Sequence, residues 1–78
     1  MTPRDAALAV LRASEGPLHW TVVLDRALRS GHLDPFSTPD VRGAMLAGLR
    51  ELAASGEIAR VEKGVFAQKP ARDTEGNA

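Results

Sequence analysis

Apolar residues recur at helical spacing in three stretches of the chain, which cover residues 3–14, 21–30 and 39–55. The expected buried faces consist of Ala7, Leu8, Val10 and Leu11, then Val23, Leu24, Ala27 and Leu28, and finally Val41, Met45, Leu49 and Leu52. On the third stretch, the opposite face consists of Gly43, Ala47 and Arg50, with Arg42 and Leu46 at its edge. The pattern therefore predicts three amphipathic helices.

Residues that favour helix ends bound these stretches. Thr2 and Thr38 each precede a proline, which suits an N-cap followed by the first helical position, and Thr21 can cap the second helix. A glycine is expected to end each helix. Gly16, in left-handed conformation and followed by Pro17, ends the first helix, Gly31 ends the second and Gly56 ends the third. Residues 32–37 are predicted to form a loop.

Three short extended segments complete the pattern. Residues 18–20 are too short for a helix, and residues 57–61 and 65–68 are strand-like on either side of a turn in which Gly64 can take positive φ. We expect Trp20 to join this hairpin as a third strand, and the hairpin to pack on the helices through Ile58, Val61 and Phe66.

The order of elements predicts an α+β, mainly α fold. It is a winged helix-turn-helix of three helices plus a small two- or three-stranded β-hairpin wing, spanning residues 1–68. Residues 69–78 have no apolar pattern and are predicted to form a disordered C-terminal tail.

Composition narrows the class of protein. The 78 residues suffice for one small domain with a thin core, and the chain has no cysteine for a disulfide or a thiolate metal site. Apolar runs are too short to span a membrane, and no secretory signal pattern is visible, so we expect a soluble, cytoplasmic protein. Ten Lys and Arg balance ten Asp and Glu, whereas most nucleic-acid-binding proteins carry a basic excess.

The third helix is nevertheless where a helix-turn-helix meets the major groove, and wing cations often contact phosphate. The expected nucleic-acid contacts are Thr38, Arg42, Gly43, Arg50, Arg60 and Lys63. The alternative is that these cations are solvated surface charges, because Asp40, Glu51, Glu57 and Glu62 lie beside them in the sequence.

A second hypothesis is protein docking. Gly43, Leu46 and Ala47 form a small apolar face that suits close approach of a partner. The alternative is that Leu46 is half-buried against the second helix.

No pattern of catalytic residues is apparent. His19 and His32 lack metal-ligand spacing and no oriented partner for a general base is evident, so we expect neither an enzyme nor a cofactor or metal site. Trp20 could stack on a base, but its position between elements favours a core anchor.

Three segments resemble one known family. Residues 16–20 (Gly-Pro-Leu-His-Trp), Thr38-Pro39 and residues 64–67 (Gly-Val-Phe-Ala) resemble, in this order, the HARE helix-turn-helix domain, over about residues 2–68. That family includes the N-terminal part of the bacterial RNA polymerase delta subunit and modules in restriction enzymes and chromatin regulators. The loop before Thr38, the short wing and the less polar third helix depart from its pattern. The resemblance implies a winged-helix module in transcription or DNA-linked assemblies, with DNA or a protein such as RNA polymerase as partner.

Overall fold

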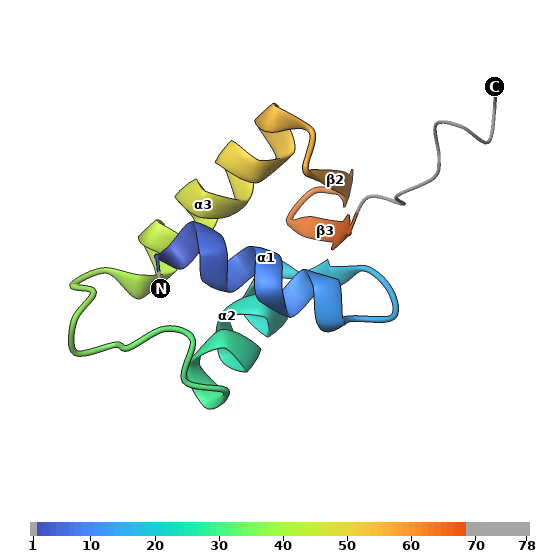
Figure 1. The fold of residues 1–78 in the computed structure, drawn as a ribbon. Helices are drawn as coiled ribbons and strands as arrows, with labels where there is room; N and C mark the ends of the chain where they lie inside the picture. Colours follow the sequence, from blue (N-terminus) through green and yellow to red (C-terminus); the bar gives the residue numbers. More distant parts are fainter. Residues whose placement is uncertain (1, 69–78) are drawn as a thin grey trace, which may run out of the picture.

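Three helices and a three-stranded antiparallel sheet make up the fold (Figure 1). The computed structural model describes residues 2–68, so the predicted disordered tail lies outside the described residues. The sheet has the order β1-β3-β2, which confirms the predicted α+β winged-helix fold with three strands. The elements are α1 (Pro3–Ala13), β1 (Leu18–His19), α2 (Trp20–Arg29), α3 (Val41–Ser55), β2 (Ile58–Glu62) and β3 (Val65–Gln68).

One hydrophobic core joins the helices, the loop before α3 and the hairpin. Most of its fully buried side chains come from the predicted faces, and Leu8, Leu24, Leu28 and Val41 of those faces pack against it half-buried. Ala6 of α1 and Leu33 of the loop are also buried and were not predicted. The helical periodicity therefore identified the inward faces correctly. The buried set is Ala6, Ala7, Val10, Leu11, Val23, Ala27, Leu33, Met45, Leu49, Leu52, Ile58 and Phe66.

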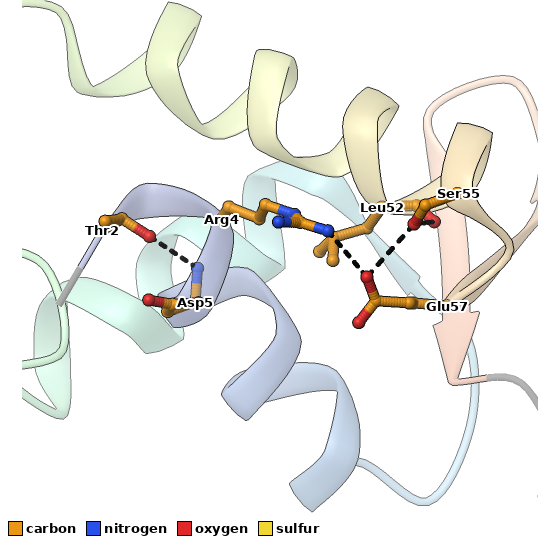
Figure 2. Close-up of polar contacts among 6 residues, drawn as sticks. All are labelled: Thr2, Arg4, Asp5, Leu52, Ser55 and Glu57. Carbon is orange, nitrogen blue, oxygen red and sulfur yellow. Dashed lines mark hydrogen bonds and ion pairs between the residues drawn. The ribbon is translucent and has the colours of Figure 1, made fainter.

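The N-terminal turn of α1 lies directly against α3. Gly48 is buried there, and a Cβ at this position would lie only 3.0 Å from the Cα of Arg4. The Arg4 side chain continues along α3 to Glu57, where the guanidinium Nη2 meets the carboxylate at 2.7 Å, and the Ser55 hydroxyl donates to the same carboxylate (Figure 2). Thr2 caps α1 as expected, since its Oγ1 accepts from the Asp5 N–H at 3.1 Å (Figure 2).

Two predicted N-caps are each wrong by two residues. The N-cap of α2 is His19, whose Nδ1 accepts from the N–H of Thr21, so Thr21 lies inside the helix. Asp40 caps α3 through the Gly43 N–H at 3.0 Å, and the helix begins after Thr38-Pro39. In each case another acceptor reaches the free N–H groups of the first turn, and that acceptor defines the start.

The predicted glycine stop of α1 is also wrong. The helix ends at Ala13, Ser14 is extended, and positive φ among residues 2–68 occurs at Gly31, Gly56 and Gly64 but not at Gly16. Instead, the Ser14 hydroxyl accepts from the Gly16 N–H and closes a local turn.

The hairpin departs from the prediction at one side chain. Ile58 and Phe66 are buried, but Val61 is 50% exposed. Side chains alternate along a strand, so positions 58 and 61, three residues apart, cannot both face the helices. Residues 18 and 19 pair with β3. Trp20 begins α2 instead of extending the strand, and its N–H donates to the Gly64 carbonyl in the turn at 2.8 Å.

Candidate nucleic-acid interface

A cleft of about 410 Å³ separates the C-terminal half of α3 from the wing formed by β2 and β3. Its cationic side chains are Arg50 from α3, Arg60 from β2 and Lys63 from the turn. Three of the cations expected to contact nucleic acid therefore meet on one concave surface. The remaining lining residues are Trp20, Leu46, Ala53, Gly64 and Phe66, which form an apolar floor.

Spacing along α3 explains which side chains reach this cleft. Residues 42, 46, 50 and 53 follow one another at intervals of four, four and three, which places them on one stripe of a helix. We call Arg42, Leu46, Arg50 and Ala53 the wing flank of α3. Leu46, half-buried, provides apolar lining, and Arg50 is exposed beside it.

The acidic residues near these cations in the sequence lie elsewhere. No carboxylate lines the cleft within the described range of the chain. Glu57 is paired with Arg4, and Glu51 lines a separate hollow together with the N-cap and first turn of α1, residues 2–5. Positive and negative side chains therefore lie on different surfaces, although the net charge of the chain is zero, and the side chains at the cleft are the positive ones.

A β-bulge accounts for the position of Glu62. Arg60 pairs with Phe66, but Glu62 pairs with Val65, so the register shifts by one residue between positions 60 and 62. Paired residues share a face of the sheet, and Val65 lies on the face opposite to Phe66. Without the bulge, strand alternation would put Glu62 beside Arg60; with it, the carboxylate turns to the outer face.

The wing is held close to the start of α2. Gly64 has a φ of 76°, which its two-residue turn requires, and a Cβ there would lie 3.1 Å from His19 Nε2 and 3.3 Å from Trp20 Cδ1. A side chain at position 64 would push the turn away from the tryptophan. This contact fixes Lys63 at the edge of the cleft.

Arg42 lies at the N-terminal end of the wing flank and is held by Trp20. Its guanidinium carbon is 5.4 Å from the centroid of the indole ring, within the range of a cation–π contact. Trp20 packs against the core, as its position in the sequence indicates, but its contact with Arg42 was not predicted. The spacing of Arg42, Leu46 and Arg50 already indicates that these three side chains share one side of the helix. The contact between Arg42 and Trp20 depends on the tertiary fold and is not visible in the sequence.

Two other expected contact residues support the N-terminus of α3. The N–H of Thr38 donates to the Asp34 carbonyl at 3.2 Å, and the N–H of Gly43 is bonded to the Asp40 carboxylate. An ideal Cβ on Gly43 would overlap this carboxylate. The structure does not bring Thr38 or Gly43 into the cleft.

Two of the three residues of the predicted docking face, Leu46 and Ala47, are separated. Leu46 lines the cleft, whereas Ala47 lies on the other side of α3, in the hollow formed with α1. We call Ala44, Ala47, Gly48 and Glu51 the α1 flank of α3. Its small residues already allow a close approach, and the element that approaches is α1 of the same chain.

No protein-family model matches the chain, and neither a curated protein nor a solved structure matches it. Among residues 2–68, no group of three or more His, Asp or Glu side chains could hold a metal ion. None of the helices in this part of the chain is long and apolar enough to cross a membrane.

Proposed function

We propose that this chain is a small winged-helix module that binds DNA through the cleft between α3 and the wing. It acts in transcription or another DNA-linked assembly in the cytoplasm and has no catalytic site of its own. The observation that carries the proposal is the convergence of Arg50, Arg60 and Lys63 on one concave surface that no carboxylate lines in the described part of the chain.

The charges suit a phosphate backbone. Arg and Lys gain affinity by releasing counterions condensed on DNA, independently of its sequence. Arg50 lies on the helix that meets the major groove in this architecture, where a guanidinium can bind guanine with two hydrogen bonds. Arg60 and Lys63 on the wing would add contacts to phosphate.

The first test is fluorescence anisotropy of a labelled random-sequence duplex titrated with the protein at several salt concentrations. Each neutralised phosphate contributes about 0.9 to the slope of log affinity against log salt. If each of the three cleft cations neutralises one phosphate, the magnitude of the slope should be about 2.7. Arg50→Gln, Arg60→Gln and Lys63→Gln should each lower that slope by about 0.9.

Arg26→Gln is the matched control, because Arg26 is an exposed arginine on α2 that does not line the cleft. It removes the same charge and should leave the slope unchanged. Absence of binding at low salt, or equal loss with Arg26→Gln and the cleft variants, would contradict a DNA site in the cleft.

A second candidate is docking on a protein such as RNA polymerase, as the family resemblance implies. One observation favours it: Leu46 is only half-buried and adds apolar surface to the cleft, where an apolar side chain of a partner could pack. On this hypothesis Leu46→Ser abolishes binding to the partner, while Arg50→Gln has little effect. On the DNA hypothesis Leu46→Ser changes DNA affinity less than Arg50→Gln does.

A further inference from the structure

The loop between α2 and α3 presents an isolated aromatic ring to solvent. Phe36 is 97% exposed, which is unusual for a large apolar side chain in a small domain. Residues 31–40 also contain Asp34 and Asp40 but no Lys or Arg. The neighbouring cations Arg29 and Arg42 contact Asp25 and Trp20, respectively. The loop is therefore an acidic segment with a projecting ring.

Hydrogen bonds organise this loop. The Asp34 carboxylate accepts from the Phe36 N–H and from the Ser37 hydroxyl, both at 2.9 Å. The Asp34 carbonyl also accepts from the N–H groups of Ser37 and Thr38. The bonds that the carboxylate accepts from the Phe36 N–H and the Ser37 hydroxyl lower the pKa of the Asp34 carboxyl, so it is negatively charged at neutral pH. Because the turn is already ordered, docking of the ring costs less conformational entropy than docking of a flexible loop.

The cleft between α3 and the wing complements the loop in charge and in shape. It combines an apolar floor that includes Trp20 and Phe66 with the cations Arg50, Arg60 and Lys63. At about 410 Å³ it is large enough for a phenyl ring, since pockets for whole small molecules start at about 300 Å³. The loop leads into the N-terminal end of α3, whereas the wing follows its C-terminal end (Figure 1). Phe36 does not line the cleft of its own chain.

We propose that Phe36 of one copy of this chain inserts into the cleft of a second copy, with Asp34 brought toward the cleft cations. The contact joins two different surfaces, so it is head-to-tail and can propagate or close into a ring. This goes beyond the proposed function and does not require DNA binding. Where DNA does bind the cleft, the two occupants exclude each other.

The contact is weak by its size. A phenyl ring buries about 150–250 Å², whereas stable interfaces bury about 1,200–2,000 Å² in total. Association is therefore expected only at high protein concentration, and added salt should weaken it, because part of the attraction is between charges.

Sedimentation equilibrium from about 10 µM to about 1 mM, the range of weak association, tests the proposal. The weight-average mass of the wild type should rise with concentration, and Phe36→Ala should remain at the monomer mass. Arg60→Glu should also remain monomeric, because it places a carboxylate where Asp34 of the other copy arrives. Val22→Ala truncates another exposed apolar residue, on α2, and should associate like the wild type.

Mixing the two monomeric variants makes the test specific. Phe36→Ala keeps an intact cleft and Arg60→Glu keeps the ring, so an equimolar mixture should form a dimer and nothing larger. In the wild type, the fluorescence of Trp20, the single tryptophan, should change as association proceeds. A wild type that stays monomeric, a Phe36→Ala variant that associates normally, or a mixture that stays monomeric would overturn the proposal.

These results are separable from those on DNA. Phe36→Ala should bind the labelled duplex with unchanged salt slope, because the ring is outside the cleft. A wild type that binds the duplex but stays monomeric refutes only the head-to-tail contact. Self-association without DNA binding at low salt refutes only the proposed function.

Discussion

The two flanks of α3 carry adjacent residues that serve different purposes. The wing flank opens onto a cleft with Arg50 and the wing cations, and its apolar residue Leu46 is half-buried. The α1 flank holds Gly48, buried against the backbone of α1, and Glu51. Positions 50 and 51 differ by about 100° around the helix, which suffices to send opposite charges to different surfaces. Net charge is therefore a poor guide to binding in a domain this small, because one helix can separate its charges by face.

The apolar floor of the cleft that the wing flank borders should be the point most sensitive to truncation. Phe66 is 4% exposed, and Phe66→Ala is expected to lower the free energy of unfolding by about 3–5 kcal/mol. Phe36→Ala removes the same atoms from a side chain that is 97% exposed and should change stability by less than about 0.5 kcal/mol. Urea denaturation followed by circular dichroism measures both. Similar stability of the two variants would mean that the hairpin does not pack on the helices.

The α1 flank has its own critical residue. Gly48→Val inserts a branched side chain where the first added carbon would already lie 3.0 Å from the Arg4 Cα and 3.1 Å from its N. Overpacking of this kind costs about 1–3 kcal/mol, since the two helix backbones must separate. The neighbouring exposed position provides the control, and Ala47→Val should cost about 0.5 kcal/mol through helix propensity alone.

Thermal unfolding of both variants distinguishes packing from propensity. If Gly48→Val is no less stable than Ala47→Val, the close approach of α1 and α3 is not rigid, and the α1 flank would be available to a partner after all.

The separation of charge between the flanks predicts a smaller, functional difference. Arg50→Gln should reduce the salt slope of DNA binding by about 0.9, whereas Glu51→Gln should leave it unchanged. Both side chains are exposed and consecutive in the sequence, but Arg50 lines the cleft and Glu51 lines the hollow beside α1. The anisotropy titration checks this directly. A gain in DNA affinity with Glu51→Gln, as large as the loss with Arg50→Gln, would show that the DNA contacts both flanks.

The sequence predicted those parts of the structure that depend on local periodicity. The repeat of Val41, Met45, Leu49 and Leu52 defines the buried face of α3 without any information on its partners. The turn at Gly64 was also predictable, because tight hairpin turns place a residue at positive φ and glycine adopts it without strain.

Features that depend on competition or on distant contacts were not predictable. Both Thr38 and Asp40 are good N-caps, and the structure uses Asp40, whose carboxylate accepts from the Gly43 N–H. The position of Glu62 depends on one extra residue in the register of β2 against β3, which no alternation pattern reveals. The charge of the cleft could therefore not be derived from the order of charges along the chain.

The smallest predicted effect concerns the loop that precedes both flanks. The N–H of Phe36 and the Ser37 hydroxyl hold the pKa of the Asp34 carboxyl below its ordinary value. A carboxyl with a pKa lower in the folded than in the unfolded state stabilises the fold fully above the unfolded pKa. That contribution is lost as pH falls through the folded pKa, below about pH 4.

Asp34→Asn retains an acceptor for the Phe36 N–H but does not titrate. The stability difference between wild type and Asp34→Asn should therefore shrink as pH falls below about 4 and stay constant from pH 5 to 8. Denaturation over this range measures the difference, and carbon NMR of the carboxyl measures the pKa itself. A pKa at or above the ordinary value would mean that the turn is open in solution. Phe36 would then not be presented in a fixed direction, whereas a lowered pKa keeps a negative charge beside Phe36 at every pH used for DNA titration. That charge would oppose contact between this loop and phosphate and leave DNA binding to the cleft at the other end of α3.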